Sequence, residues 1–167
     1  MSDAGEALRV RLREATPDDA TAVRRVADAA WHDAHADIVG ADAVEEFLAT
    51  YYDPEDLRER FGTGDSVTFV AEDDDVVAYA SGVPSDDGYT LGSLYVHPDR
   101  QGEGVGSRLL ARVEDAARDA GYDALDLVVM AENDDTIAFY EAKGYERAGD
   151  HHDELLDVDG YVYEKPL

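Results

Sequence analysis

The first third of the chain changes from an alternating to a helical pattern of apolar residues. Apolar residues and arginines alternate over residues 8–13, which predicts a strand with one buried face. Thr16-Pro17 then provides a helix N-cap and a first-turn proline, and apolar residues between positions 20 and 31 recur at steps of three and four. We therefore expect a long amphipathic helix, followed by two shorter helices around residues 44–51 and 54–61.

The middle of the chain returns to a period of two. Residues 67–71, 76–83 and 89–96 each have the alternating apolar pattern of a strand. An acidic cluster at positions 72–75 and the sequence Pro84-Ser85-Asp86-Asp87-Gly88 separate these strands, and both are typical of turns. Three strands joined by such short turns indicate an antiparallel meander.

The last third of the chain mixes helices and strands. A helical pattern over residues 105–120 ends at a glycine, and a strand is expected over residues 125–129. A second helix is expected over residues 134–143, and residues 145–167 predict two final strands. The predicted order β-α-α-β-β-β-α-β-α-β-β describes one mixed α/β domain that occupies residues 1–167.

The composition narrows the classes of function. The chain has 14 Lys and Arg residues against 40 Asp and Glu residues, so its formal net charge is −26. Such a chain lacks the clustered cations that nucleic acid binding needs, and the absence of cysteine excludes disulfides, a thiol nucleophile and iron–sulfur ligation. With Lys143 and Lys165 as its only lysines, the acid excess is typical of halophilic proteins from a high-salt cytoplasm, although an acidic mesophilic protein has a similar composition.

The sequence has no pattern of export or membrane insertion. No apolar run approaches the roughly 18 residues that a membrane-spanning helix needs. Residues 1–6 lack the basic and apolar regions of a signal peptide. We therefore expect a cytoplasmic protein without a membrane partner.

The segment most suggestive of chemistry joins a strand to a helix. Leu94-Tyr95-Val96-His97-Pro98 is followed by Gly102, Gly104 and Gly106, directly before the helix. Glycines at alternate positions allow backbone N–H groups to point at one place, where the helix start adds unpaired amides and its dipole. This arrangement binds anions, typically phosphate, although a tightly packed turn without a ligand gives the same pattern. The dinucleotide fingerprint is not met, because Ser107 occupies its third glycine position.

Two motifs in the right order give this sequence a family resemblance. Gln101-x-x-Gly104-x-Gly106 closely resembles the acyl-coenzyme A signature of the GCN5-related N-acetyltransferase (GNAT) family. Downstream, Asn133, Phe139-Tyr140-Glu141 and Gly144-Tyr145 match a second pattern of that family. The resemblance, which is best over residues 66–147, implies an α/β (α+β) fold with a mixed, mostly antiparallel central sheet of about seven strands. It also implies that the central strands splay apart, that about four to five helices flank the sheet, and that the cofactor enters the gap.

The resemblance implies that acetyl-CoA is the acetyl donor and assigns residues to it. The pantetheine arm is expected beside Leu94, Tyr95 and Val96, where a backbone amide would polarise the thioester carbonyl. Asn133 is expected either to bond this arm or to cap the next helix. Glu103 is expected to point to solvent. The diphosphate is expected on the backbone amides of Gln101, Gly102, Gly104, Val105, Gly106 and Ser107.

The resemblance assigns only part of the catalytic machinery. Tyr140 matches the family's general acid, which protonates the departing thiolate, although a helix tyrosine can equally serve only in packing. Many relatives carry a glutamate as general base at a position that Thr90 occupies here, which leaves the base open. One hypothesis is that a water chain touching Ser93 or His97 accepts the proton of the amine.

Several residues are candidates for an acceptor site or for a metal. Trp31, His35 and Tyr52 lie in the part of the chain where the family builds its acceptor pocket, although each could equally be a core or helix-surface residue. His32 and His35 share a helix face, and His151-His152-Asp153-Glu154 has a metal-like composition. Neither cluster has a third well-spaced partner, so we expect no metal.

The function implied by the resemblance is transfer of the acetyl group of acetyl-CoA to a primary amine, by direct attack in a ternary complex. Without cysteine, the chain cannot carry an acetyl-cysteine intermediate. The acceptor is expected to be an amine-bearing small molecule or a protein or peptide, and family members often form a homodimer through late strands. Two alternatives stay open: a non-catalytic acyl-CoA-binding regulatory module, consistent with Thr90, and a structural domain whose glycine turn binds no ligand.

Overall fold

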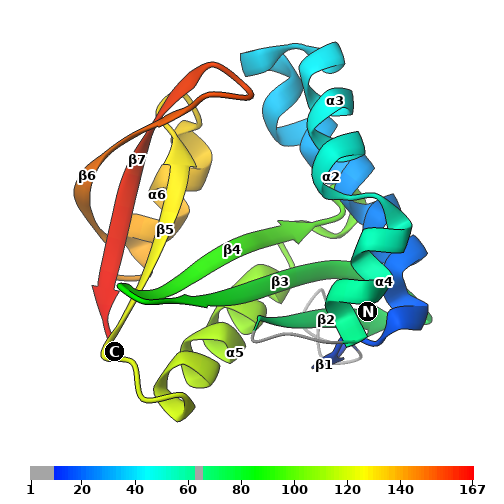
Figure 1. Cartoon of the computed structure of the whole chain (residues 1–167), viewed down its shortest axis with the longest axis horizontal. Coiled ribbons are helices and arrows are strands. Elements are labelled where there is room, and N and C mark those ends of the chain that lie inside the picture. The colour runs from blue at the N-terminus through cyan, green and yellow to red at the C-terminus, as the bar shows by residue number, and fades with distance from the viewer. Residues whose placement is uncertain (1–9, 63–65) are drawn as a thin grey trace.

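The computed structural model describes residues 10–62 and 66–167, and within these ranges the chain forms one seven-stranded sheet (Figure 1). The strand order is β1-β2-β3-β4-β5-β7-β6. Every neighbouring pair is antiparallel except β4 and β5, which are parallel. The strands are β1 (Arg11–Glu14), β2 (Val67–Asp73), β3 (Asp75–Ser85), β4 (Gly88–Val96), β5 (Ala124–Met130), β6 (Glu146–Asp153) and β7 (Val158–Pro166).

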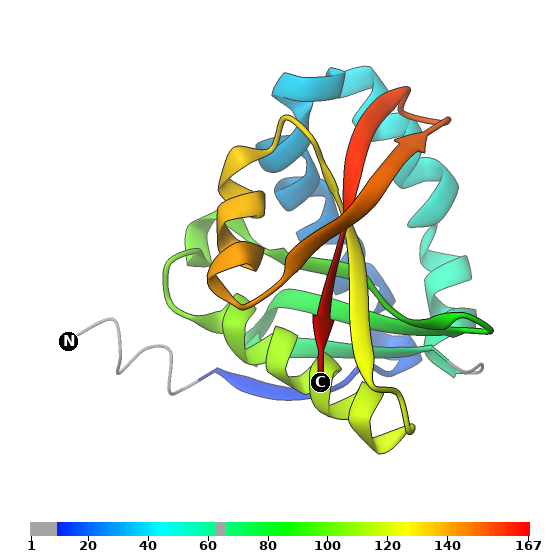
Figure 2. The same cartoon turned by 90° about the vertical axis from the view of Figure 1, so that its left-hand side faces the viewer.

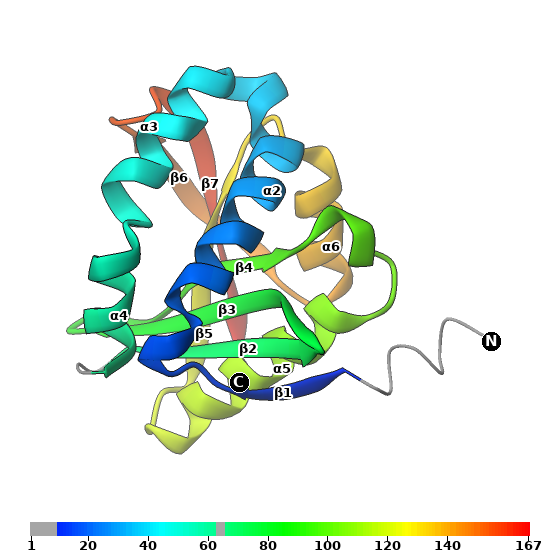
Figure 3. The same cartoon turned by 90° about the vertical axis from the view of Figure 1, so that its right-hand side faces the viewer.

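Five α-helices of the described ranges cover both faces of the sheet. Helices α2, α3 and α4 lie on one face of the N-terminal strands and α5 lies on the other, as Figures 1 and 3 show. Helix α6 lies next to the C-terminal strands (Figure 2). The helices are η1 (Pro17–Asp19), α2 (Ala20–Val39), α3 (Ala41–Tyr51), α4 (Pro54–Gly62), η2 (Pro98–Arg100), α5 (Val105–Asp119) and α6 (Asp134–Ala142), where η marks a short 3-10 helix.

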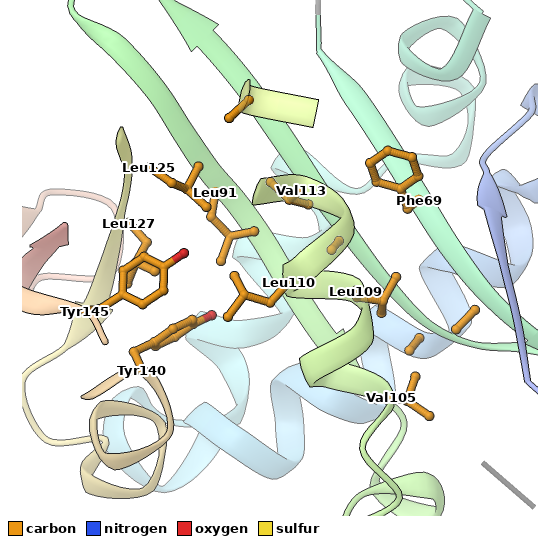
Figure 4. Packing of buried hydrophobic residues seen from close by; sticks show 14 of the residues in the cluster. Phe69, Leu91, Val105, Leu109, Leu110, Val113, Leu125, Leu127, Tyr140 and Tyr145 are labelled. Carbon is orange, nitrogen blue, oxygen red and sulfur yellow. The ribbon is translucent and has the colours of Figure 1, made fainter. Parts of the chain in front are cut away.

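Two hydrophobic clusters fill the two faces of the N-terminal strands. Phe69 and Ala71 of β2 pack in the cluster that contains side chains of α5 and α6, part of which Figure 4 shows. Val70, between them, packs in the other cluster, with side chains of α2, α3 and α4. In β3, Tyr79 belongs to the second cluster and Ala80 to the first. Alternate residues therefore face opposite sides of the sheet, as their period of two predicts.

The central strands β4 and β5 part soon after they meet. Two residue pairs join them, Tyr89 with Leu125 and Thr90 with Asp126. Beyond these pairs, β4 continues beside β3 while β5 continues beside β7. The sheet therefore opens into a fork, which Figure 1 shows between the two strands. The predicted splaying of the central strands is confirmed.

The seven strands follow in the expected order. Three α-helices of the described ranges separate β1 from β2, as the segment-by-segment patterns predict, whereas the summarised order β-α-α-β has only two. The first strand, predicted over residues 8–13, is seen over Arg11–Glu14, and residues 8 and 9 lie outside the described ranges. The expected α/β fold, with its mixed and mostly antiparallel sheet, is confirmed. None of the helices in the described ranges is long and apolar enough to cross a membrane.

Candidate active site

A cavity of about 660 Å³ lies in the fork of the sheet. Its walls come from β4 and β5, from the turn before α5, from α6, from α2 and α3, and from the β6–β7 hairpin. The fold therefore gathers segments from most of the chain around one space. The lining includes Trp31, His35, Tyr140 and all the residues that the sequence assigns to the acetyl donor, which are Leu94, Tyr95, Val96, Gln101, Gly102, Gly104, Val105, Gly106, Ser107 and Asn133.

The glycine turn presents backbone amides to this cavity. Gly102 and Gly104 have φ angles of +84° and +83°, in the left-handed region that favours glycine. The N–H of Arg108 makes a helical bond to the carbonyl of Gly104 at 3.2 Å. The preceding amides, from residues 105–107, belong to the first turn of α5, where the helix supplies no carbonyl acceptor. Together with the helix dipole, these donors form a site suited to an anion.

Gly106 shows that packing within the protein does not explain all the glycines of the turn. A Cβ atom built on Gly106 would lie 3.6 Å from Val96 Cγ2 and 3.9 Å from Phe139 Cζ, which are ordinary contact distances. The φ angle of Gly106 is not positive, so its backbone does not require glycine either. The missing side chain does, however, leave the backbone of the turn open to the cavity. At Gly106 no side chain therefore stands between the backbone of the turn and the cavity.

Glu103 does not point to solvent, contrary to the sequence-based expectation. Its side chain is only 12% exposed and accepts hydrogen bonds from the Arg100 guanidinium, at 3.0 Å from Nε to Oε2 and 3.0 Å from Nη2 to Oε1. Arg100 also donates to Asp73 Oδ2 at 3.0 Å. The hydrogen bonds to Glu103 and Asp73 raise the pKa of Arg100. The turn is thus tied to the end of β2, and a carboxylate beside the anion site is neutralised.

The strand β4 faces the cavity along the part where it has lost β5 as a neighbour. Ser81 pairs with Ser93 and Gly82 with Leu91, so Gly92 is an extra, bulged residue of β4. Peptide groups of β4 on this free edge have no strand partner, which leaves donors and acceptors for an extended ligand.

Side chains of the same strand point to different faces. Leu94 and Val96 pack against the cluster that contains α5, whereas Tyr95 packs against the cluster that contains α2. Leu94 and Val96 therefore line the cavity on the side of the glycine turn. Tyr95 contributes its ring to the side of α2.

Tyr140 is buried at the cavity wall, in α6. Tyr140 is 6% exposed as a residue, and its ring lies edge-on to that of Tyr145 (Figure 4), with 5.7 Å between the ring centroids. Burial raises the pKa of the Tyr140 phenol, which keeps it protonated at neutral pH. The Tyr145 hydroxyl donates to Glu114 at 2.8 Å, but the Tyr140 hydroxyl has no hydrogen-bond partner among the described residues. The phenolic proton of Tyr140 is therefore not engaged in a hydrogen bond within the described part of the chain.

Asn133 caps α6 while it lines the cavity. Its Oδ1 accepts a hydrogen bond from the backbone N–H of Thr136 at 3.3 Å, as the capping alternative expects. The Asn133 amide nitrogen is not used in this bond. A contact of that nitrogen with a ligand is compatible with the cap, so the two expected roles do not compete.

The residues considered for the general base lie in different places. Thr90 is outside the cavity lining, and its hydroxyl donates to Asp126. His97 is also outside the lining, and its Nδ1 accepts from the backbone N–H of Asp99 at 3.2 Å. Ser93 does line the cavity, with its hydroxyl 2.7 Å from that of Ser81. Only Ser93 of these three can touch a water in the cavity.

The side of the cavity formed by α2 and α3 contains aromatic residues. Trp31 and His35 line it, whereas Tyr52 does not: the Tyr52 hydroxyl accepts a hydrogen bond from Tyr79 at 2.9 Å in the core. Phe47 and the hairpin residues Asp153, Leu156 and Asp159 line the cavity and were not singled out as site residues from the sequence. Phe47 carried only the signal of an apolar position on a helix, and Asp153 was noted only as part of the metal-like cluster His151-His152-Asp153-Glu154. Leu156 and Asp159 carried no signal of a site.

The histidines offer no metal cluster. Among the described residues, no group of three or more His, Cys, Asp or Glu side chains is arranged to hold a metal ion. His152 instead contacts two carboxylates of its own hairpin, Asp159 at 2.9 Å and Asp157 at 3.2 Å. His35 lies 3.1 Å from the Tyr95 hydroxyl through Nε2, and burial lowers the pKa of His35 to about 4.

Comparison with known proteins adds an evolutionary relationship to this geometry. A family model described as Acetyltransferase (GNAT) family matches residues 28–145, a range that includes both sequence motifs. The chain belongs to this family. The resemblance inferred from the motifs is therefore confirmed, and the GNAT match extends from α2 to the end of α6.

Two curated relatives support the GNAT assignment over shorter parts of their lengths. The L-amino acid N-acyltransferase MnaT of Escherichia coli (strain K12) is 38% identical over 53 residues, which are 32% of this chain and 31% of that protein. The mycothiol acetyltransferase of Propionibacterium freudenreichii subsp. shermanii is 32% identical over 143 residues, which are 81% of this chain and 43% of that protein. The chain thus matches less than half the length of each of these relatives.

A solved N-acetyltransferase structure shares the fold over nearly the whole chain. The PaiA N-acetyltransferase from Thermoplasma acidophilum, crystallised in complex with coenzyme A, has a TM-score of 0.85 at 20% sequence identity. The match covers 95% of this chain and 99% of that chain. At this identity the comparison establishes the common fold.

Proposed function

We propose that this protein transfers the acetyl group of acetyl-CoA to a primary amine by direct attack in a ternary complex. The observation that carries the proposal is the glycine turn, whose unused amides open onto a cavity between two parted strands that also contains a protonated, unpartnered tyrosine. Membership of the GNAT family supports the same reaction class. The names of both curated relatives support acyl transfer, and the name of the amino acid N-acyltransferase supports transfer to nitrogen.

The described residues fit acetyl-CoA. Acetyl-CoA, when bound, supplies the acetyl group as a thioester, whose carbonyl carbon is open to attack. The bare backbone at Gly106 would admit the diphosphate, and the Arg100–Glu103 pair would remove a repelling charge beside it. The free edge of β4 beside Leu94, Tyr95 and Val96 would accept the extended arm as a further strand does. The donors for the diphosphate would be the amides of Gln101, Gly102, Gly104, Val105, Gly106 and Ser107.

Two groups of the chain would stabilise the charges of the reaction. A backbone N–H on the free edge of β4 would donate to the carbonyl oxygen and stabilise negative charge there. Tyr140 would donate its phenolic proton to the departing thiolate. A thiol has an ordinary pKa of about 8.5 and a phenol of about 10, so this transfer is close to balanced when it begins from a hydrogen bond. The raised pKa of Tyr140 keeps the proton available over the whole range in which the protein would work.

The proton of the incoming amine needs a separate route. No carboxylate of β4 lines the cavity, and the hydroxyl of Thr90 is held by Asp126. We infer that a water bound to Ser93 takes up this proton, because Ser93 is the candidate whose hydroxyl lies on the cavity wall. His97, outside the lining, would not take part. A His97→Ala variant is therefore expected to keep the pH profile of the native protein.

The charge of the chain bears on where this reaction would run. With a net charge of −26, the protein repels an anionic cofactor unless salt screens the repulsion. We infer that the protein is halophilic and works in the cytoplasm of a cell with high internal salt. Retention of structure at molar salt and its loss in dilute buffer would support this inference, and the reverse order would contradict it.

Titration with coenzyme A, followed by a turnover assay, tests the proposal. Calorimetry in high salt is expected to give one bound coenzyme A per chain. Acetyl-CoA with a panel of primary amines is then expected to yield acetylated amine and free thiol in equal amounts. Binding without turnover would replace the enzyme by the non-catalytic acyl-CoA-binding module, which the absence of a β4 carboxylate also fits. No binding by folded protein would contradict both.

A further inference from the structure

The part of the cavity next to α2 has a wall of aromatic rings. Trp31 of α2 and Phe47 of α3 are stacked, with ring centroids 4.2 Å apart and planes inclined by 26°. Tyr95 of β4 lies 5.3 Å from the Trp31 centroid, with its plane inclined by 37°. We name these three residues, all of which line the cavity, the aromatic wall. Beside them, Ala30 and Ala34 line the same side with small side chains, which leaves room against the rings.

The aromatic wall is held in place by His35, which lines the cavity next to it. His35 Nε2 lies 3.1 Å from the Tyr95 hydroxyl, and the His35 and Tyr95 rings are nearly perpendicular. His35 also lies edge-on to Trp31, with 4.5 Å between centroids. Rings fixed in this way form an aromatic lining that loses little side-chain entropy when a ligand binds. The ring of a ligand packs favourably against such a lining, either offset-stacked or edge-on.

The charges near the wall favour a cation and disfavour a carboxylate. Among the described residues that line the cavity, Arg100 is the one lysine or arginine, and it lies at the glycine turn, bonded to Glu103 and Asp73. On the side of the hairpin, the lining carboxylates are Asp153 and Asp159.

The other groups on this side of the cavity leave that balance unchanged. Asp153 also accepts the backbone N–H of Leu156 at 2.9 Å, and Asp159 faces His152. His151 lines the cavity as well, and His35 is neutral because burial lowers its pKa to about 4. A ligand carboxylate would therefore enter without a permanent cation to pair with, at a cost in desolvation.

The hairpin bounds this part of the cavity. Leu156, at the tip between β6 and β7, is 8% exposed and packs in the same cluster as Trp31 and Leu48. Figures 1 and 3 show the hairpin tip beside the end of α2 and the start of α3. The aromatic wall therefore faces a space enclosed by helices and hairpin. A compact molecule fits such a space better than a folded protein surface does.

We propose that the acceptor is a small primary amine with a flat apolar body and without a carboxylate, which stacks on the aromatic wall of Trp31, Phe47 and Tyr95. The inference rests on the proposed acetyl transfer and names the acceptor class of the same cavity. It differs from what the name of the amino acid N-acyltransferase relative suggests, because an amino acid carries the carboxylate that this cavity does not match.

A matched pair of amines tests the absence of the carboxylate. Phenethylamine and phenylalanine share the ring and the amine, and they differ in the carboxylate. With saturating acetyl-CoA, kcat/KM for phenethylamine is expected to exceed that for phenylalanine at least about tenfold. It is also expected to exceed that for propylamine, which has the amine without the ring. Higher kcat/KM for phenylalanine or for propylamine would overturn the inference and leave the proposed function standing.

A pair of variants tests the aromatic wall. Phe47→Leu is expected to raise KM for phenethylamine about fivefold more than KM for propylamine, because a stacking surface is lost. Phe61→Leu is the control, since Phe61 packs against the same hydrophobic cluster but does not line the cavity. An equal rise of KM for both amines in Phe47→Leu, or the same rise in Phe61→Leu, would overturn the role of the wall.

Tryptophan fluorescence provides a readout that does not need turnover. Trp31 is the only tryptophan of the chain, so emission excited selectively from tryptophan reports on the wall. Phenethylamine added to protein loaded with coenzyme A is expected to change this emission saturably, and phenylalanine at equal concentration is not. Coenzyme A binding without any phenethylamine response would overturn the inference alone. Failure of coenzyme A to bind would overturn the proposed function and this inference together.

Discussion

The glycine turn and the aromatic wall belong to one cavity but are built in different ways. The turn offers main-chain N–H groups, and its side chains matter mainly by being small, as at Gly106, or neutralised, as at Glu103. The wall offers aromatic side chains from three elements, α2, α3 and β4. A main-chain site depends on the course of the chain, whereas a side-chain site depends on which residues happen to meet. A main-chain site therefore suits a ligand that is the same in all family members, and a side-chain site suits a ligand that differs among them.

This contrast also explains how an acidic protein can bind an anionic cofactor. Amide dipoles attract phosphate without any lysine, so the excess of 40 acidic over 14 basic residues does not interfere with the construction of the turn. The same excess of acidic residues provides the carboxylates of Asp153 and Asp159 on the side of the aromatic wall. The glycine turn thus attracts an anion despite the acidic composition of the chain, whereas the aromatic wall has acidic side chains beside it.

Replacement of Tyr140, which lines the same cavity from α6, is expected to have the largest effect. Tyr140→Phe should lower kcat about a hundredfold, because the proton for the departing thiolate is removed. The dissociation constant of coenzyme A should stay the same, as measured by calorimetry. Tyr122→Phe is the matched control, since Tyr122 packs against Tyr89 outside the cavity. Equal losses in the two variants would show that phenol hydroxyls act here only in packing.

The pH dependence of the native protein sharpens this prediction. Burial raises the pKa of Tyr140 above the ordinary value of about 10, so the phenol of the folded protein stays protonated up to and beyond that pH. The rate should therefore not fall between about pH 8 and pH 10 through loss of this proton. Stability behaves alike: the preference of the fold for protonated Tyr140 is fully present below about pH 10 and is lost as the pH rises through the raised value. A fall in kcat centred near pH 8 or 9 would contradict the assignment.

A methyl group at Gly106 should separate binding from folding. Gly106→Ala is expected to raise the dissociation constant of coenzyme A about tenfold, because a Cβ would stand where the backbone is open to the ligand. Stability should rise slightly, by about 0.5 kcal/mol, since alanine is the better residue within a helix. Gly149→Ala in β6, where a Cβ has nothing within 4 Å, is the control for both measurements. Unchanged affinity would mean that the turn is only a structural feature.

Salt should act in opposite directions on the two parts of the cavity. Raising it from about 0.1 M to about 1 M shortens the Debye length from about 10 Å to about 3 Å and screens the repulsion between this chain and coenzyme A. The affinity for coenzyme A is therefore expected to rise roughly threefold. The KM for a cationic amine is expected to rise as well, because its attraction to the acidic surround weakens. If salt strengthened, or weakened, the binding of both coenzyme A and the amine, this would contradict the electrostatic difference between the two parts of the cavity.

The smallest effect is expected at Asn133. Asn133→Ala removes the bond to the Thr136 amide and should lower the free energy of unfolding by about 1 kcal/mol, measured by denaturant titration. Asn133→Asp should restore this stability, because aspartate caps a helix as well as asparagine does. Both variants lose the side-chain amide donor, so both should bind coenzyme A a few-fold more weakly. If Asn133→Asp recovered the affinity for coenzyme A together with the stability, Asn133 would act only as a helix cap.

Much of the fold could be predicted because local patterns encode it. The alternation in β2 and β3 places Val70 and Tyr79 on one face of the sheet and Phe69 and Ala80 on the other, and the glycine turn marks the start of α5. The donor side of the cavity was predictable for the same reason, since residues 94–107 form one continuous stretch whose chemistry lies in its backbone. The parting of β4 and β5 came only from the family resemblance, because no local pattern records which strands separate.

The remaining features depend on contacts that sequence spacing does not record. Glu103 was expected in solvent, but Arg100 three residues earlier reaches back to it and to Asp73 at the end of β2. The aromatic wall combines positions 31, 47 and 95, and nothing in their spacing relates one to another. Tyr52 was as good a candidate as Trp31, yet it faces Tyr79 in the core. Side-chain direction decides such cases, and it follows from tertiary packing.

The two halves of the sheet are coupled loosely by their backbones, through the pairs of Tyr89 with Leu125 and of Thr90 with Asp126. Helix α5 adds a second connection, because Lys165 of β7 reaches Glu114 at 3.0 Å. A ligand that binds both β4 and β5 would connect the two halves of the sheet and would raise the melting temperature of the protein. Ligand at a hundred times its dissociation constant contributes about 2.7 kcal/mol in this way. The resistance of this protein to heat would then follow the supply of its cofactor, so that a cell short of acetyl donors would also keep less of the folded protein.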